Sequence, residues 1–446
     1  MAAQGADERQ SRGGWRFLLR ALSHRNYRLF FLGQSVSLIG TWLTRVATSW
    51  LVYRLTGSAM LLGIIGFCGQ IPTFLLGPFA GVLVDRWNRH RLLVVTQVLS
   101  MLQSFALAVL ALMGIITVWE IAWLMVLQGL INAFDIPARQ SFVVEMVEDR
   151  ADLPNAIALN SSMFNGARLL GPSVAGALIA AAGEGGCFLI DGFSYVAVIL
   201  SLLAMRITLR PRERKSQHVL TELKEGFDYA FRFPPIRAIL GLLALVSLMG
   251  MPFTVLMPVM ASEVLHGGPN TLGFLMAASG LGAFCGAGFL ASRRTVRGFG
   301  VVIISTATLF GVGLVAFALS RHVALSLLTM VVVGFGMIVT MAASNTVLQT
   351  IVEERMRGRL MSFYSMAFMG TAPFGSLLAG LLATRIGAPT TIAIGGGACL
   401  LGAAWMRLRL PALREAVRPI YVRLGILPEV ASGMQSASNQ TGPAES

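Results

Sequence analysis

Charged side chains inside strongly apolar stretches are the residues of this sequence best suited to chemistry. Arg45, Asp135, Arg168 and Asp191 each interrupt a long apolar segment. A charge in hydrocarbon costs about 3 kcal/mol on insertion scales, so it must face a cavity or a partner. A carboxylate can take up and release a proton there, whereas an arginine stays charged and needs a counter-anion. We therefore expect Asp135 and Asp191 to be proton-coupling candidates, and Arg45 and Arg168 to line a substrate cavity.

Each of these charges could instead belong to a static salt bridge that holds helices together. Asp135 is the clearest case, because Arg139 follows four residues later and can pair with it across one helical turn. Pro137 lies between them and weakens the helix geometry of that pair. Both interpretations stay open from the sequence alone.

The second half of the chain offers mainly neutral side chains for such a cavity. Its apolar segments carry one charge, Glu263, near a segment end. The polar and aromatic candidates in this half are Asn345, Gln349 and Phe368. Two arginines facing these groups suit an amphipathic, neutral-to-anionic small molecule rather than a sugar or a cationic drug. If both arginines are paired internally, the cavity suits lipophilic drugs instead.

The sequence contains no recognisable catalytic or metal-binding motif. The five histidines lie near the ends of apolar segments or in polar connections, and the four cysteines are far apart. The cysteines lack metal-ligand spacing, and there is no H-E-x-x-H, G-x-S-x-G or Walker A motif. We therefore predict no enzyme activity, no metal and no cofactor. An intramembrane enzyme or an ion channel remains the alternative.

The elements that position these residues are predicted to be membrane-spanning helices. The chain has 446 residues, of which 55% are hydrophobic and 13% charged, whereas soluble domains carry about 25% charged residues. A spanning helix needs about 20 apolar residues. Eight charge-free runs are long enough, and four more apolar segments carry isolated charges, at 29–53, 120–142, 154–182 and 186–208. We therefore predict an all-α membrane protein with twelve transmembrane helices.

The basic residues predict the orientation of these helices. All but five of the 35 Lys and Arg residues fall at every second junction between apolar segments. This is the positive-inside pattern, which predicts a bacterial-type inner membrane protein with both termini on the cytoplasmic side. The net charge of +14 therefore indicates contact with membrane lipid. Nucleic acid is not an expected partner, because the sequence lacks a surface module of aromatic and basic residues.

A glycine-rich repeat divides the chain into two similar parts. Four glycines of GARLLGPSVAGALIAAAG recur 204 positions later in GTAPFGSLLAGLLATRIG. Parallel repeats with a site at their interface are a transporter architecture, so we predict two six-helix bundles in the same orientation within a monomer. Small residues allow helices to approach closely. The residues expected to pack at this interface are Gly166, Gly171, Pro172, Gly176, Gly370, Gly375 and Gly380.

The polar connections set the expected domain boundaries. Residues 1–27 are a cytoplasmic lead, 28–208 the first bundle and 209–235 a cytoplasmic amphipathic connector. Residues 236–408 are the second bundle, and 409–446 are a cytoplasmic tail. The paired prolines at 234 and 235 end the helix expected in the connector.

The loop GVLVDRWNRHR at 81–91 is the first motif that resembles a known family. Gly81, Asp85, Arg86, Arg89 and Arg91 match the signature G-x-x-x-D-R-x-x-R-x-R of the major facilitator superfamily. A glycine permits close packing, an Asp can meet the N-terminus of a facing helix, and arginines can bridge to helix ends or lipid phosphates. The residues are therefore predicted to form a cytoplasmic gate. The alternative is a basic loop that only determines topology.

Three further segments narrow the resemblance. NAFDIPARQSFVVEMV at 132–147, RGRLMSFYS at 357–365 and GQSVSLIGTW at 33–42 resemble the subgroup of enterobactin exporters and macrolide efflux proteins. The pair at 171–172, Gly-Pro, also resembles the antiporter signature of the family's fifth helix. The resemblance spans nearly all of 27–408. It implies alternating access driven by an ion gradient, usually of protons, and efflux of a siderophore-like or drug-like molecule.

Overall fold

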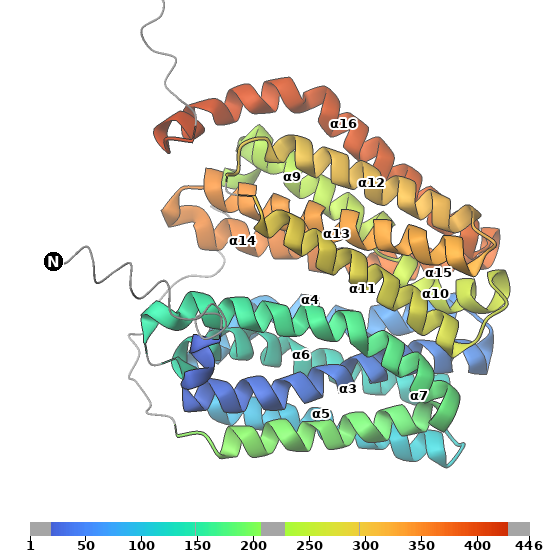
Figure 1. Cartoon of the computed structure of the whole chain (residues 1–446). Helices are drawn as coiled ribbons and strands as arrows, with labels where there is room; N and C mark the ends of the chain where they lie inside the picture. The colour runs from blue at the N-terminus through green and yellow to red at the C-terminus, as the bar shows by residue number, and fades with distance from the viewer. Residues whose placement is uncertain (1–18, 148, 207–227, 294, 427–446) are drawn as a thin grey trace, which may run out of the picture.

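The structure is a computed structural model that describes residues 19–147, 149–206, 228–293 and 295–426. The structure also leaves out four side chains within these ranges, those of Pro78, Val82, Asp85 and Arg150. Every regular element among the described residues is a helix. Figure 1 shows these helices in two groups, with α3 to α7 in one and α9 to α16 in the other. We call these groups the first half and the second half.

The first half consists of long helices joined by short turns that the sequence caps well. Gly57 ends its first helix in the left-handed conformation, with φ 58°, which glycine adopts without a Cβ penalty. The Ser58 and Asn88 side chains accept backbone N–H groups at the next two helix starts, as N-caps do. The long helices are α3 Arg25–Thr56, α4 Ala59–Arg86, α5 Arg89–Leu112, α6 Val118–Met146 and α7 Leu153–Leu203, and the 3₁₀ turns are η1 Arg20–Ser23 and η2 Arg150–Asp152.

The second half contains both regular helices and helices interrupted by π-helical turns. Its first helical chain comprises α9 Pro234–Leu245, the π turn η3 Val246–Gly250, α10 Phe253–Val259 and the π turn η4 Met260–Val264. Its regular helices are α11 Pro269–Ala291, α12 Phe299–Leu319, α13 Val323–Ile351 and α16 Ala388–Arg423. Between α13 and α16 lie η5 Glu354–Met356, α14 Arg357–Ser365, the π turn η6 Met366–Gly370 and α15 Ala372–Ile386.

Ten helices among the described residues are long and apolar enough to cross a membrane. The helix α3 has 32 residues but is not among the ten. The helix α7 has 51 residues and is broken at Gly183, whose φ of 72° and ψ of 177° are not helical. The two predicted segments 154–182 and 186–208 therefore lie on either side of the break at Gly183, and α7 contains both of them.

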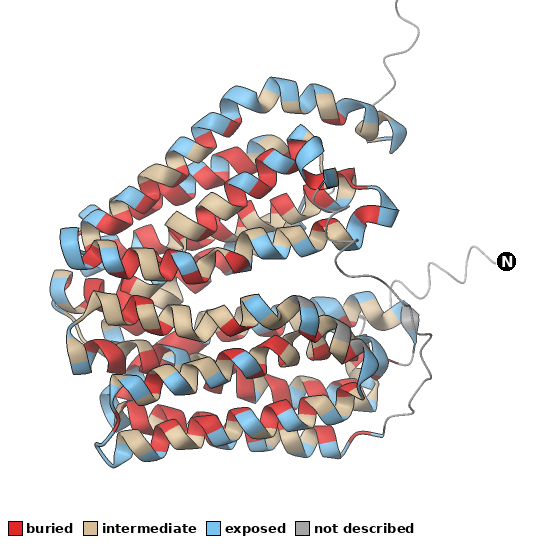
Figure 2. Ribbon diagram, turned by 180° about the vertical axis from the view of Figure 1, so that it is seen from behind, coloured by how far each residue is buried: buried red, intermediate tan, exposed pale blue. Residues whose placement is uncertain are grey.

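Apolar side chains cover much of the outside of both halves. Trp123 and Leu401 are each 74% exposed, and Figure 2 shows exposed positions along the outward faces of the helices and buried positions between them. Soluble monomers rarely expose extended apolar patches. The exposed apolar surface is therefore the surface expected to face lipid.

The last helix extends beyond the predicted boundary at 408. The structure continues α16 to Arg423 despite Pro411 and Pro419. Leu410, Leu413 and Val417 follow one another at helical spacing and pack against the core of the second half, and such a stripe favours an amphipathic helix. Residues 409–423, expected as part of a tail, are thus helical. Residues 1–18, most of the expected connector at 207–227, and 427–446 lie outside the described residues.

Candidate functional site

The two halves meet along two helix pairs, α7 with α11 and α4 with α15. At the first crossing, a Cβ on Gly273 would lie 2.6 Å from the Pro172 carbonyl oxygen and 3.0 Å from Gly176 Cα. At the second, a Cβ on Gly63 would lie 2.6 Å from the Ser376 carbonyl oxygen and 3.0 Å from Gly380 Cα. Both crossings therefore bring backbone against backbone, which only residues without a Cβ allow.

The two crossings are equivalent under the repeat found in the sequence. Pro172 and Ser376 differ by 204 positions, as do Gly176 and Gly380. On the facing helices, Gly63 and Gly273 differ by 210. The distances at the two crossings are the same, 2.6 Å to a carbonyl oxygen and 3.0 Å to a Cα, as a repeat that includes α4 and α11 would produce.

Two of the glycines expected at this interface pack elsewhere. A Cβ on Gly171 would lie 2.8 Å from Trp42 Cγ of α3, and one on Gly375 would lie 2.9 Å from Pro252 Cγ beside α10. Each therefore packs inside its own half. The reason is helical geometry, because positions five residues apart point about 140° away from each other. Gly171 and Gly176 therefore cannot share a face, and the expectation for Gly171 and Gly375 was wrong.

The remaining pair of repeat glycines is not symmetrical. A Cβ on Gly370 would lie 2.5 Å from the Phe74 ring of the first half, whereas Gly166 has no atom within 4 Å of such a Cβ. Phe374, on the same helix chain as Gly370, makes edge contacts with Phe67 and Phe74, with ring centroids 6.0 Å apart in each case. Gly370 therefore belongs to the interface, and Gly166 does not in this conformation.

We expect Gly380→Ala to destabilise the contact between halves. Its Cβ would lie 2.9 Å from the Ala59 carbonyl oxygen, and backbone cannot move aside as a side chain can. Overpacking of this kind costs about 1–3 kcal/mol. Thermal unfolding of the purified protein in detergent measures the change. Gly166→Ala is the matched control, and equal stability of the two variants would contradict the crossing.

One polar contact between halves lies at the end of the molecule opposite η1 and the end of α16, which we call the far end. There Tyr53 donates to Glu263 Oε1 across the interface at 2.6 Å. Arg54 beside it pairs with Glu184 inside the first half, with Nε 2.7 Å from Oε1. The largest hydrophobic cluster includes residues of both halves, such as Leu43 and Phe310, and so joins them.

The opposite end, where η1 and the end of α16 lie, is built differently, and we call it the termini end (Figure 1). There the first half has a core of its own, formed by Tyr27, Phe30, Leu93 and Phe142 with their neighbours. Described residues of the second half do not take part in this cluster. The described contacts therefore join the two halves at the far end, whereas the first half has a separate core at the termini end.

Arg45 and Arg168 lie together in the central part of the first half. Arg45 is exposed, and its guanidinium lies 5.2 Å from the centroid of the Trp42 ring. Arg168 is half-buried, and its Nη2 is 3.9 Å from Sδ of Met337 on α13 of the second half. The two guanidinium groups are close enough to repel each other electrostatically. Neither has a carboxylate within salt-bridge distance among the described residues.

Two of the neutral candidates of the second half, Asn345 and Gln349, lie on α13, the helix whose Met337 contacts Arg168. Asn345 follows Met337 by two helical turns on α13, and its Oδ1 accepts a hydrogen bond from Gln349. The carbonyl oxygen of Phe368, in the π turn η6, accepts from Ser247 in the π turn η3. Gln349 is exposed, and Asn345 and Phe368 are half-buried. No direct contact among the described residues joins these three to the two arginines.

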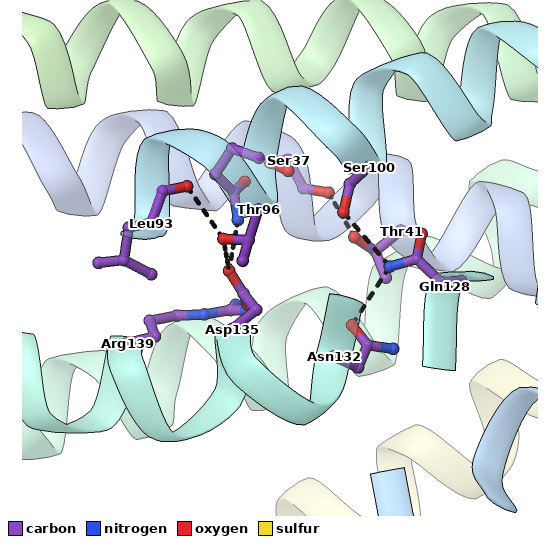
Figure 3. A network of polar contacts seen from close by, with 10 residues as sticks. Ser37, Thr41, Leu93, Thr96, Ser100, Gln128, Asn132, Asp135 and Arg139 are labelled. Carbon is purple, nitrogen blue, oxygen red and sulfur yellow. Dashed lines mark hydrogen bonds and ion pairs between the residues drawn. The ribbon is translucent and has the colours of Figure 1, made fainter. Parts of the chain in front are cut away.

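Asp135 is buried in a network of polar side chains (Figure 3). It accepts from Thr96 Oγ1 at 2.9 Å and from Gln97 Nε2 at 2.8 Å, both on α5, and it pairs with Arg139. The i, i+4 ion pair therefore forms although Pro137 lies between its members. Asp135 thus has the cationic partner that a static salt bridge requires.

Asp191 is as deeply buried but has a different set of partners. Its Oδ2 accepts from Ser104 of α5 at 2.6 Å and from Thr44 of α3 at 2.7 Å. Ser194 lies 3.4 Å from Oδ1. Asp191 is 1% exposed and has no cation within salt-bridge distance among the described residues. A buried carboxylate without a cation is costly when charged, which makes Asp191 better suited than Asp135 to hold a proton.

A buried polar stripe on α5 connects the surroundings of the two carboxylates. The stripe binds Asp135 at one end and Asp191 at the other. Between them, Ser100 accepts from Gln128, which also donates to Asn132 (Figure 3). Sequence reasoning missed this stripe, although its spacing marks one face of a helix. Its residues are Thr96, Gln97, Ser100, Gln103 and Ser104, all of them buried.

The motif at the end of α4 and the start of α5 contains an ion pair between a buried arginine and an exposed glutamate. Arg89 is 5% exposed and donates to Glu145 Oε1 at the end of α6, at 2.8 Å. Arg86 and Arg91 are exposed. Gly81 has no atom within 4 Å of an added Cβ, so the close packing expected there is not observed. The side chain of Asp85, on which the predicted gate depends, lies outside the described residues.

Sequence comparison identifies one matching family and several relatives. A family described as Transmembrane secretion effector, MFS_3, matches residues 18–424. The "Staphyloferrin A transporter" of Staphylococcus aureus is 26% identical over 83% of this chain and 92% of that protein. The "Multidrug efflux pump Tap" of Mycolicibacterium fortuitum is 29% identical over 84% of this chain and 93% of that protein.

Solved structures share the architecture. A bacterial homolog of the human lysosomal transporter Spinster, in an inward-facing and unoccupied conformation, has a TM-score of 0.63 at 14% identity. The alignment covers 90% of this chain and 98% of that chain. At this identity the similarity shows the fold alone.

Proposed function

Because the chain belongs to the transmembrane secretion effector family of the major facilitator superfamily, we propose that it exports small amphipathic organic molecules by proton-coupled alternating access. The family and its efflux relatives make the chain a multi-pass membrane transporter with small-molecule substrates and not an enzyme. The coupling ion, the mechanism and the substrate class are proposals, each argued below from a different part of the structure.

The main support for alternating access is the pair of glycine crossings between the two halves. Two halves that meet mainly along two pairs of helices, with backbone close to backbone at each crossing, can rock against each other about these contacts. In the described conformation they are joined at the far end, where Tyr53 and Glu263 meet. The proposed cycle opens this end and closes the other. The residues proposed to act as the gate at the termini end lie at the end of α4 and the start of α5, and they are Gly81, Asp85, Arg86, Arg89 and Arg91.

We propose twelve spans, in two six-helix repeats with both termini in the cytoplasm of the inner membrane. The count follows if α3 spans and if the two arms of α7, on either side of Gly183, span separately. The crossings at Gly63 and Gly273 support the repeat, because both lie near the start of their helices. The described conformation would then be open toward the cytoplasm, as an exporter must be to load substrate.

The substrate proposed is amphipathic and neutral to anionic. Arg45 and Arg168 contribute two permanent positive charges that have no carboxylate partner among the described residues, and Arg168 lies next to Met337 of the other half. A carboxylate or phenolate of a substrate would satisfy them with charge-assisted hydrogen bonds. The names of the relatives include both a siderophore transporter and a drug efflux pump, and the unpaired arginines favour an acidic substrate.

Transport into inverted membrane vesicles tests the proposed function. A panel of radiolabelled compounds should include staphyloferrin A, a macrolide and a cationic dye. We expect at least one anionic compound to accumulate when a proton gradient is imposed, because the gradient supplies the free energy for uphill transport. A protonophore should abolish that accumulation, and vesicles without the protein are the control. Accumulation that survives the protonophore would exclude proton coupling and point to sodium exchange or uniport.

A further inference from the structure

The proposed proton site and the proposed substrate site are joined by two adjacent residues of α3, Thr44 and Arg45. Thr44 donates to Asp191 at 2.7 Å, and the next residue, Arg45, lies over Trp42 within electrostatic reach of Arg168. Consecutive residues of a helix point about 100° apart. One turn of α3 therefore presents one side chain to the buried carboxylate and its neighbour to the proposed substrate site.

The hydrogen bonds at Asp191 make this contact sensitive to a proton. Thr44 and Ser104 both donate to the same oxygen, Oδ2. A protonated carboxyl oxygen has a hydrogen of its own to donate and less capacity to accept. When Oδ2 takes a proton from water, one of the two hydroxyls must turn and accept that hydrogen. If the hydroxyl is that of Thr44, its own hydrogen needs a new acceptor, and a carbonyl of α3 one turn earlier is within reach, as for Thr41 and Ser37.

Few other charged or titratable groups surround Asp191. From its own helix, Tyr195 lies close to it and faces Thr41 of α3. From α6, Asp135 and Arg139 lie within electrostatic range of Tyr195 and are paired with each other. The residue of α5 that binds Asp191 is Ser104, a hydroxyl. Arg45 of α3 does not reach it, because its guanidinium lies over Trp42.

We infer that Thr44 is the positioning residue that couples a proton on Asp191 to the substrate-binding Arg45. Protonation of Asp191 changes the hydrogen bond of Thr44, shifts this turn of α3 and moves the Arg45 guanidinium relative to Trp42 and Arg168. Proton and substrate then occupy separate sites in the first half, linked through two adjacent residues. The inference rests on the proposed proton-coupled export and names the residue that links its two sites.

Trp42 provides a reporter that needs neither substrate nor gradient. The chain has seven tryptophans, and replacing the other six with Phe leaves Trp42 alone. A cation over the indole ring interacts with it strongly, so movement of Arg45 should change its fluorescence. We expect the emission of the purified full chain in detergent to titrate between pH 5 and pH 9. Asp191→Asn should remove this titration.

Variants of Thr44 decide the inference. Thr44→Val should remove the titration of Trp42 as Asp191→Asn does, and Thr44→Ser, which keeps the hydroxyl, should restore it. Thr48→Val is the matched control, since Thr48 lies one turn further along α3 and its buried hydroxyl has no hydrogen-bond partner in the part of the chain that the structure describes. Thr48→Val should leave the titration intact. Thr44→Ala serves as a second test if Thr44→Val does not fold.

The inference is overturned if Thr44→Val or Thr44→Ala retains the full titration, if Asp191→Asn retains it, or if Trp42 does not titrate at all. These outcomes are separate from failure of the proposed export. Vesicles can show protonophore-sensitive transport while Trp42 is insensitive to Thr44. Equally, Trp42 can titrate through Thr44 in a protein that does not accumulate any compound of the panel.

Discussion

Asp191→Asn should abolish uphill accumulation of substrate in inverted vesicles while exchange down a concentration gradient continues. Asn keeps the size of Asp and can still accept hydrogen bonds from Thr44 and Ser104, but it cannot bind and release a proton at this position. The transporter should then cycle without using the proton gradient. The expected effect is complete, with the internal concentration falling to that outside.

Two measurements on the same vesicles separate this result from a loss of folding. Counterflow exchange of labelled for unlabelled substrate should remain, because it needs no gradient. Glu354→Gln, which removes an exposed carboxylate, should accumulate substrate like the wild type. Asp135→Asn is informative in comparison, since Asp135 already has Arg139 as a partner. If only Asp135→Asn uncouples transport, the assignment of the proton to Asp191 is wrong.

Arg168→Gln should weaken binding of anionic substrates by about 2 kcal/mol, or about thirty-fold in Kd, the value expected for loss of a hydrogen bond to a charged group. Gln can still donate a hydrogen bond but carries no charge. Arg45→Gln should have an effect of similar size, because the two guanidinium groups lie close together without carboxylate partners. Binding to the purified protein, measured by calorimetry with acidic and basic compounds of matched size, checks both.

The predicted loss of anion binding can be tested against a control arginine outside the proposed site. Arg385→Gln removes an exposed arginine at the end of α15 and should leave binding unchanged. Neutral compounds should bind Arg168→Gln and the wild type about equally, since only the charge is lost. If cationic dyes bind best and neither Arg45→Gln nor Arg168→Gln alters binding of anions, the site takes lipophilic cations and the proposed substrate class is wrong.

The intramembrane charges could be predicted from sequence because each stands alone in an apolar segment. Their partners could not, since Thr44 and Ser104 reach Asp191 from two other helices and the neighbours of a helix do not follow from its own residues. For Asp135, the sequence indicated the local partner, Arg139, but not Thr96 or Gln97 of α5. The spacing of the polar residues on α5 was visible in the sequence, and it would have indicated the buried stripe.

The glycine repeat likewise could be predicted from the sequence only in part. Glycines 204 positions apart predict that α7 and the chain ending in α15 are equivalent, because both segments keep the same glycine spacing. Which glycine faces which helix depended on the turn of the helix, so Gly176 lies at the interface while Gly171 packs against Trp42. The matching glycines of the facing helices, Gly63 and Gly273, stand in segments too different for the repeat to be recognised by eye.

The two crossings also constrain how such a chain can evolve. Each pairs a glycine from one half with a glycine from the other, Gly63 with Gly380 and Gly176 with Gly273. A side chain gained at one member needs space that its partner, in the other half, must supply. Residues elsewhere in the two halves can therefore change independently of each other, but these pairs cannot. Among relatives of this chain, we expect the residues of each pair to change together or to remain small.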